Sequence, residues 1–128
     1  LSGAPNAGFS HAKPWLPLGP DHSDMSVGVQ EDDPDSVLNF TRHLLKLRRE
    51  NPVLRFGDVS FADVPEPLLV MYRTTQTETV TCLFNLGDVT VEIPGDIDLD
   101  GHVLVKSGGA TGLMDRELPP YAFVLLKH

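Results

Sequence analysis

Cysteine is almost absent from this sequence, because Cys82 is the only one among 128 residues. A single cysteine excludes any disulfide bond within the chain. Cys82 lies inside the apolar run Val80–Leu86, so we expect a small buried hydrophobic side chain rather than a nucleophile. The five histidines are scattered, and no pair of them shows the helical spacing of a zinc site. The sequence therefore predicts neither a metal centre nor a cofactor.

Long hydrophobic runs and an excess of basic residues are also missing. The longest apolar runs, Leu68–Tyr72 and Tyr121–Leu126, are far below the roughly 20 residues of a membrane-spanning helix. The net charge is −8, which argues against a nucleic-acid surface because such a surface needs clustered lysine and arginine. No secretory leader is visible at the start. We therefore expect a cytoplasmic protein with neither membrane nor nucleic-acid partners.

The first quarter of the chain, residues 1–33, does not show the pattern of a regular element. Prolines and glycines interrupt it at Pro5, Gly8, Pro14, Pro17, Gly19, Pro20 and Gly28. Phe9, Trp15 and Leu16 argue against disorder, since disordered segments are poor in such residues. Structureless loops longer than about 12–15 residues are uncommon in compact domains. We therefore expect a loop that packs on a larger body outside these 128 residues.

A helix is predicted over residues 34–50. Asp33 would cap it and Pro34 would take the first helical position. The acidic stretch Glu31–Asp35 would then lie at the positive end of the helix dipole, so we interpret it as capping rather than as a metal or acid–base site. Asn51-Pro52 would end the helix. Its broad apolar face needs a substantial partner and consists of Val37, Leu38, Phe40, Thr41, Leu44, Leu45 and Leu47.

From residue 53 onward the pattern changes to short strands separated by tight turns. Val59 and Phe61 alternate with polar residues. The further predicted strands are Leu68–Arg73, Thr79–Leu86, Val89–Ile93, His102–Lys106 and Ala122–Lys127. This arrangement is typical of a small antiparallel β-sandwich. The predicted fold is mostly β with one long helix, and it divides near Asn51–Leu54 into residues 1–52 and residues 53–128.

Several short motifs follow one another in a fixed order. They are Pro5-Asn6-Ala7-Gly8-Phe9-Ser10, Lys13-Pro14-Trp15-Leu16-Pro17-Leu18, Ser26-Val27-Gly28-Val29-Gln30, the helix with its exit Asn51-Pro52-Val53-Leu54, Phe56-Gly57-Asp58, Phe84-Asn85-Leu86 and Leu118-Pro119-Pro120-Tyr121. Together they resemble the C-terminal quarter of an α-glucosidase of the α-amylase superfamily, glycoside hydrolase family 13, in its oligo-1,6-glucosidase-like branch. One departure is Gly28, which stands where the family usually has an acidic residue.

The resemblance implies the last loop and helix of a (β/α)8 barrel, followed by an antiparallel β-sandwich called domain C. It also implies retaining hydrolysis or transfer of α-glucosyl units by two carboxyl groups, which lie at the C-terminal ends of barrel strands. None of those strands' motifs occurs here, so we assign no catalytic residue and expect the chain alone to be inactive. The implied partners are the remainder of the barrel and an α-glucosyl oligosaccharide, with a homo-oligomer left open.

The same resemblance places the long loop beside the substrate cleft. His22 and Asp24 lie in this loop and are the candidates for contacts at the rim of the cleft. The alternative for both is a hydrogen bond within the loop at the surface. Trp15 has the chemistry to stack on a sugar ring, but we expect it to anchor the loop to its own protein.

Two other functions stay open at this point. The parent enzyme could be a sucrose isomerase or another glucosyltransferase of the same family, because the residues that decide between them lie mostly upstream. The β-sandwich could instead be a stand-alone carbohydrate-binding module. Such modules usually show a platform of two or more exposed aromatic residues, and residues 53–128 contain no tryptophan.

Overall fold

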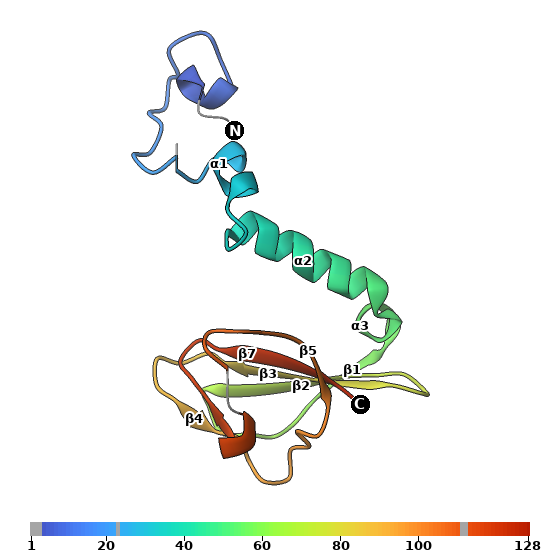
Figure 1. Ribbon diagram of the computed structural model, residues 1–128. Coiled ribbons are helices and arrows are strands. Elements are labelled where there is room, and N and C mark those ends of the chain that lie inside the picture. The colour runs from blue at the N-terminus through green and yellow to red at the C-terminus, as the bar shows by residue number, and fades with distance from the viewer. Residues whose placement is uncertain (1–3, 23, 111–112) are drawn as a thin grey trace. The chain divides into compact units, whose positions relative to one another are not determined.

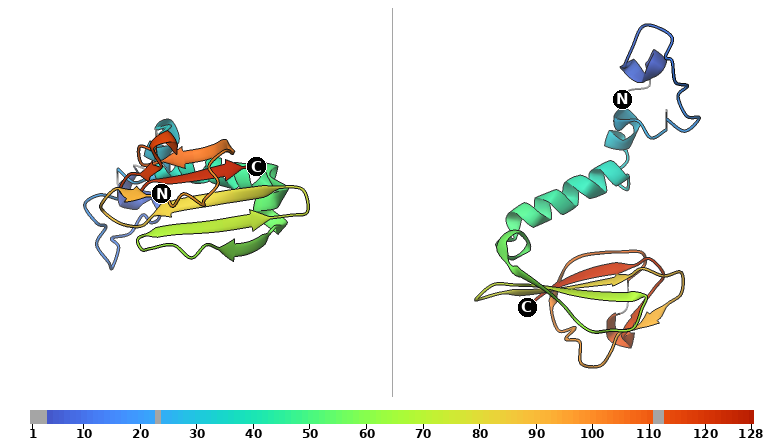
Figure 2. Two further views of the ribbon diagram at one scale, coloured as in Figure 1. Left: turned by 90° about the horizontal axis from the view of Figure 1, so that it is seen from below. Right: turned by 180° about the vertical axis from the view of Figure 1, so that it is seen from behind.

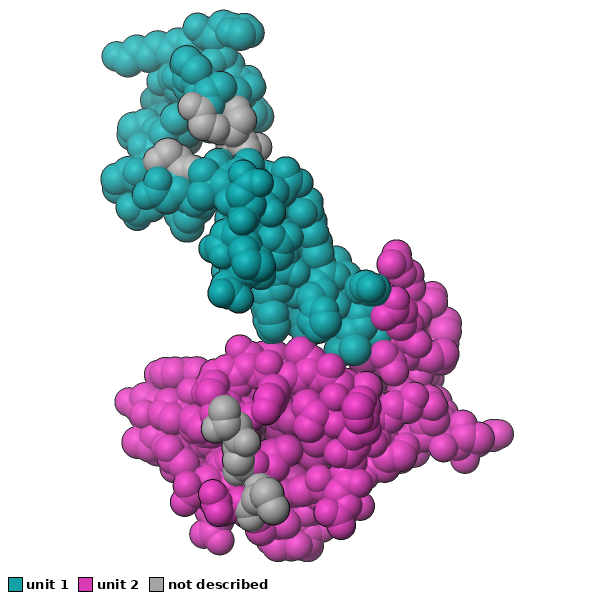
Figure 3. Space-filling view, in the orientation of Figure 1, with its two compact units in different colours: residues 1–47 teal, residues 48–128 magenta. Residues whose placement is uncertain are grey.

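A computed structural model describes residues 4–22, 24–110 and 113–128 of the chain (Figure 1). The chain divides into two compact units, residues 1–47 and residues 48–128, which are coloured separately in Figure 3 and are described separately below. Within the described ranges, no helix is both long enough and apolar enough to cross a membrane.

Unit 1 contains more regular structure than its proline and glycine content predicts. A short 3-10 segment, η1, covers Pro5–Gly8, and a six-residue helix, α1, covers Val27–Asp32. The prediction that residues 1–33 contain no regular element is therefore wrong for α1. The hydroxyl oxygen of Ser26 accepts a hydrogen bond from the Val29 amide at 3.4 Å and caps this helix.

The long helix α2 covers Val37–Glu50, so it begins three residues later than predicted. Asp33 does not cap it, because the Asp33 carboxylate accepts from the Asp35 amide at 3.0 Å and its carbonyl accepts from the Ser36 amide at 3.1 Å. These bonds close a turn before the helix. Ser36 is the cap instead, since its hydroxyl accepts from the Asn39 amide at 3.3 Å. The predicted end before Asn51-Pro52 is confirmed.

The apolar face of α2 has no buried residue. Val37 is 75% exposed and Leu45 is 63% exposed. The broad stripe predicted from the sequence is therefore present, and unit 1 does not bury it.

Unit 2 is built on a five-stranded antiparallel sheet with the strand order β1-β2-β3-β7-β5 (Figures 1 and 2). Its strands are β1 Asp58–Phe61, β2 Leu68–Thr74, β3 Thr79–Asn85, β5 His102–Ser107 and β7 Phe123–Lys127. A second, two-stranded antiparallel sheet pairs β4 Val91–Glu92 with β6 Glu117–Leu118, and a 3-10 turn, η2, covers Leu113–Asp115. The predicted strands are confirmed, although only two residues of the 89–93 segment pair, and β6 was not predicted.

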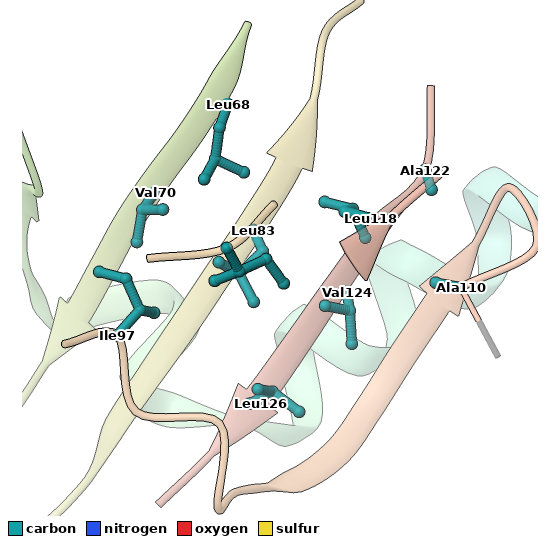
Figure 4. Close-up of a cluster of buried hydrophobic side chains, with 10 residues drawn as sticks. Leu68, Val70, Leu83, Ile97, Ala110, Leu118, Ala122, Val124 and Leu126 are labelled. Carbon is teal, nitrogen blue, oxygen red and sulfur yellow. The ribbon is translucent and has the colours of Figure 1, made fainter. Parts of the chain in front are cut away.

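The core of unit 2 lies between one face of the large sheet and the part of the chain that carries the β4–β6 sheet (Figure 1), and its side chains are drawn in Figure 4. Alternate residues of β2 and β7 point into it, as the two-residue period of a strand requires. Its members are Leu68, Val70, Leu83, Ile93, Ile97, Ala110, Leu118, Ala122, Val124 and Leu126. The predominance of antiparallel sheet with few helices is consistent with the predicted β-sandwich.

A further helix, α3, covers Pro52–Phe56 and was not predicted. Pro52 ends α2 but also occupies the first turn of α3, where its missing N–H costs nothing. Val53 and Leu54 are buried, and α3 packs against β2 and β3. The entry into unit 2 is therefore a short helix that shields part of the sheet.

Candidate functional site

The loop that carries His22 is closed by two hydrogen bonds between Gly19 and His22. The His22 amide donates to the Gly19 carbonyl at 3.2 Å, and the Gly19 amide donates to Nδ1 of the His22 ring at 3.0 Å. Because Nδ1 accepts this bond, the proton of the neutral ring lies on Nε2. The Nε2–H group is therefore the donor of the neutral His22 ring.

A cavity of about 590 Å³ lies within unit 1, and His22 lines it. The other lining residues come from the two loop motifs quoted above: Asn6, Ala7, Phe9, Ser10, Lys13, Pro14, Trp15, Leu16, Pro17 and Leu18. Phe9 and Trp15 are 90% and 91% exposed, so nothing in unit 1 buries either ring. The expectation that Trp15 anchors the loop to a larger body stays a prediction.

The loop motif Pro5–Ser10 is held by its asparagine. The side-chain amide of Asn6 donates to the carbonyls of Ser10 at 2.9 Å and of Ala12 at 3.1 Å. Asn6 and Ala7 both have positive φ angles of 54° and 57°, a conformation that asparagine tolerates better than most residues. These contacts give the wall of the cavity a defined shape.

Only one of the two predicted rim residues lines this cavity. His22 lines the cavity, whereas Asp24 is exposed and is not among the lining residues. Their role at a substrate cleft is not decided by the geometry of unit 1 and stays a proposal.

The junction between α1 and α2 is fixed by polar side chains that sequence reasoning missed. The side chain of Gln30 donates to the Met25 carbonyl at 2.8 Å and accepts from the Leu38 amide at 3.0 Å. The Asn39 side-chain amide donates to the carbonyls of Gln30 at 2.9 Å and Asp33 at 2.8 Å. The polar residues in the motif Ser26–Gln30 were the available signal, but their partners lie up to nine residues away.

The acidic stretch Glu31–Asp35 is not a helix N-terminal cap, contrary to our interpretation. Glu31 and Asp32 lie in the last turn of α1, and no acidic residue lies in the first turn of α2. Glu31 pairs with Arg42 at 2.9 Å, with both side chains about half exposed. Among the residues that the structure describes, no group of three or more potential metal ligands comes together.

In unit 2 a hydroxyl, an imidazole and a carboxylate lie next to one another in space. Oγ1 of Thr81 lies 3.0 Å from Nε2 of His128, and Nδ1 of His128 lies 3.7 Å from the Asp98 carboxylate. This order resembles a nucleophile–base pair with an orienting acid. Thr81, however, is buried in the middle of β3 with 1% exposure, and it lines neither of the two described cavities. We therefore interpret the contact as structural: His128, directly after β7, stabilises the position of β7 beside β3.

A second cavity of about 450 Å³ lies in unit 2. It is lined by Pro65, Glu66, Leu68, Val91, Glu92 and Pro94. The lining offers carboxylates and proline rings but no aromatic ring, so it lacks the stacking platform expected of a glucan-binding module.

Cys82 behaves as predicted from its apolar neighbours. It is buried in β3 with 1% exposure and has no disulfide partner. Burial raises the pKa of its thiol to about 11, against an opposing effect of the positive charge of Arg73. A thiol of this kind is a poor nucleophile near neutral pH.

Two family models match the chain one after the other. A model described as the alpha amylase catalytic domain matches residues 2–57. A model described as a domain of unknown function, DUF3459, matches residues 55–125, which is more than half of the chain.

Individual relatives agree with these matches. A probable alpha-glucosidase of Rhizobium meliloti is 42% identical over 106 residues, which are 80% of this chain and 19% of that protein. An oligo-1,6-glucosidase of Parageobacillus thermoglucosidasius is 28% identical over 103 residues, which are 80% of this chain and 18% of that protein. The chain thus spans about a fifth of the length of these curated relatives.

Solved structures with the same fold include two enzymes that are named as sugar synthases. A trehalulose synthase in complex with Tris matches with a TM-score of 0.83 and 25% identity, over 98% of this chain and 24% of that one. An isomaltulose synthase from Erwinia rhapontici in complex with D-glucose matches with a TM-score of 0.83 and 26% identity, over 98% and 23% of the respective chains.

Proposed function

This chain belongs to the α-amylase family, where it corresponds to the C-terminal part of an α-glucosidase-like member, and we propose that it serves a retaining α-glucosidase as a non-catalytic part. The observation that carries the proposal is the succession of the two family matches, the catalytic domain over residues 2–57 and DUF3459 over residues 55–125. The similarity of both parts to named α-glucosidases supports it further.

In this proposal, residues 1–52 are the last loop and helix of the catalytic barrel, and residues 53–128 are the β-sandwich domain beside it. The change from one family match to the other at residues 55–57 supports a division close to this point. The exposed apolar face of α2 is the surface that the remainder of the barrel would cover. Val37 and Leu45 would be buried there.

The chemistry would come from two carboxyl groups on other strands of the barrel. One carboxylate would attack the anomeric carbon, while a carboxylic acid would protonate the leaving oxygen. Water would then hydrolyse the covalent glucosyl intermediate, which gives net retention of the α configuration. No residue of this chain takes part in these steps in our proposal.

The contribution of this chain to the site would be the rim of the cleft. His22 would donate from Nε2 to a sugar hydroxyl, because Nδ1 is occupied by the Gly19 amide. Asp24, in the same loop, would accept from a sugar hydroxyl.

The cytoplasmic location expected from the sequence stays a prediction.

Glucosyl transfer within sucrose is the second candidate function. It is favoured by the two solved structures with the same fold, which are a trehalulose synthase and an isomaltulose synthase. Such enzymes share the first step with the hydrolases and differ in the acceptor that receives the glucosyl unit. The identity to these two structures is about 25%, whereas the identity to the probable alpha-glucosidase of Rhizobium meliloti is 42%, so the named α-glucosidases are the stronger guide to the activity.

The proposal is tested with the complete polypeptide that carries this sequence. It is incubated with the methyl glycoside of an α-1,6-linked glucose disaccharide and, separately, with sucrose, and the products are followed by proton NMR from the first turnover. Release of α-glucose from the disaccharide supports a retaining α-glucosidase. Conversion of sucrose into an isomeric disaccharide favours the second candidate, and first-formed β-glucose would exclude a retaining mechanism.

A further inference from the structure

We propose that Gln30 and Asn39 are positioning residues, which hold the loop that carries His22 against the N-terminal turn of α2. The inference rests on the proposed function, because it assumes that His22 contacts substrate at the rim of the cleft. Both residues lie in unit 1, and neither has a role among the expectations from the sequence.

Gln30 connects the loop to the helix with one side chain. Its Oε1 accepts from the Leu38 amide, which belongs to the first turn of α2 and has no partner within the helix. Its Nε2 donates to the Met25 carbonyl, at the end of the loop. Loss of this side chain would therefore remove a helix cap and release the loop at the same time.

Asn39 stabilises the short helix from which Gln30 projects. Its side-chain amide lies within hydrogen-bond distance of three carbonyls, those of Gln30, Glu31 and Asp33. The first two belong to the last turn of α1, where helix carbonyls lack partners of their own. A helix of six residues is not stable by itself, so α1 depends on contacts of this kind.

The hydrogen bonds continue from Gln30 to the turn that holds the His22 ring. The Met25 amide donates to the Asp21 carbonyl at 3.1 Å, next to His22 in the sequence. The Gly19 amide then fixes Nδ1 of the ring as an acceptor. These hydrogen bonds, together with the backbone between Asp21 and His22, thus connect the N-terminal turn of α2 to the turn that holds the His22 ring.

The first test measures the kinetics of the complete enzyme with an α-glucoside in four variants: Gln30→Ala, Asn39→Ala, His22→Ala and Gln30→Ala combined with His22→Ala. We expect each single variant to raise KM by roughly three- to tenfold, the effect of one lost hydrogen bond, with a smaller change in kcat. The double variant should be no worse than His22→Ala, because Gln30 acts through His22. Arg49→Ala, which changes an exposed side chain at the other end of α2, is the matched control and should leave KM unchanged.

The second test does not depend on activity. Nitrogen-15 NMR of the His22 ring, in the complete enzyme labelled at histidine, reports which ring nitrogen carries the proton. We expect a fixed Nε2–H tautomer in the unmodified protein and an average of both tautomers in Gln30→Ala. Gln30→Glu keeps the acceptor for the Leu38 amide but loses the donor to Met25, so it should also show the average.

The two tests separate the possible failures. A fixed tautomer in both Gln30 variants would overturn the positioning inference, whatever the kinetics show. An unchanged KM in Gln30→Ala alongside a raised KM in His22→Ala would overturn it as well. An unchanged KM in His22→Ala would instead remove the proposed rim contact, and the tautomer of His22 would then decide the positioning role by itself.

Discussion

The side-chain amide of Asn85, at the end of β3, lies 3.0 Å from the carbonyl oxygen of Leu118 in β6, thirty-three residues further along the chain. The same amide nitrogen donates to Val89 at 2.7 Å and to Pro119 at 2.9 Å, and its oxygen accepts from the Gly87 amide at 2.9 Å. One buried side chain thus holds the turn after β3 against the turn before β7. This gives a physical reason for the motif Phe84-Asn85-Leu86.

Asn85→Ala should lower the free energy of unfolding by about 2–4 kcal/mol, because buried carbonyls lose their donor. Asn85→Asp keeps the shape but replaces the donor by an acceptor, so it should be at least as destabilising. Urea denaturation of the 128-residue chain measures both changes. A loss below about 0.5 kcal/mol for either variant would show that the turns are held by other contacts.

Gly57 is predicted to tolerate no side chain. A Cβ atom there would lie 2.6 Å from the Val53 carbonyl oxygen and 3.0 Å from the backbone nitrogen and oxygen of Thr74. Because these are backbone atoms of α3 and β2, Gly57→Ala should cost about 1–3 kcal/mol of stability. Gly95→Ala is the matched control, since nothing lies within 4 Å of a Cβ at that position. Equal unfolding midpoints for the two variants would contradict the prediction.

Cys82 should react slowly with thiol reagents while the protein is folded. With its pKa raised to about 11, only about one thiol in a thousand is ionised at pH 8, and the side chain is buried as well. We expect alkylation to be at least roughly a hundredfold faster in denaturing urea than in buffer. Comparable rates in the two conditions would show that β3 opens readily.

The same pKa predicts a pH dependence of stability. The thiol ionises at lower pH in the unfolded chain than in the folded protein, where its pKa is raised from 9.0 to about 11. Its contribution to stability is therefore complete below pH 9 and is lost as the pH rises towards 11. Cys82→Ala should show a smaller loss of stability over this range in urea denaturation, and an identical loss would contradict the assignment.

The exposed stripe of α2 should make the isolated chain self-associate. Burying an apolar side chain such as Val37 or Leu45 contributes roughly 1.5–3 kcal/mol, so a second copy is a favourable partner when the rest of the barrel is absent. Val37→Lys combined with Leu45→Lys should shift the chain towards monomer in sedimentation velocity. His43→Lys, on the polar side of the helix, should not. A wild-type chain that is already monomeric with protected α2 amides would contradict this account.

The strands were predictable because each has alternating or continuous apolar residues between turn-forming residues. Leu68–Arg73 and Thr79–Leu86 fall almost on β2 and β3 for this reason. The helix α1 was not predictable, since Gly28 weakens it and Asn39, in another helix, supplies its last partners. The start of α2 was misplaced because Asp33 and Ser36 are both good caps, and only the turn that Asp33 forms decides between them.

The candidate site was predictable only in part. His22 could be selected from the loop that surrounds it, but its tautomer depends on the Gly19 amide, and a sequence does not display that contact. Gln30 was visible only as part of a motif, because its partners Met25 and Leu38 are brought together by folding. Long-range side-chain contacts of this kind, including that of Asn85 with Leu118, carry no local pattern.

The most direct test of the central claim is the turnover of a chromogenic α-glucoside by the purified 128-residue chain beside the complete polypeptide that carries it. The account predicts turnover by the complete polypeptide and none above the uncatalysed rate by the isolated chain, because the catalytic carboxyl groups would lie outside it. Turnover that co-elutes with the isolated chain, free of any heavier species, would contradict the account.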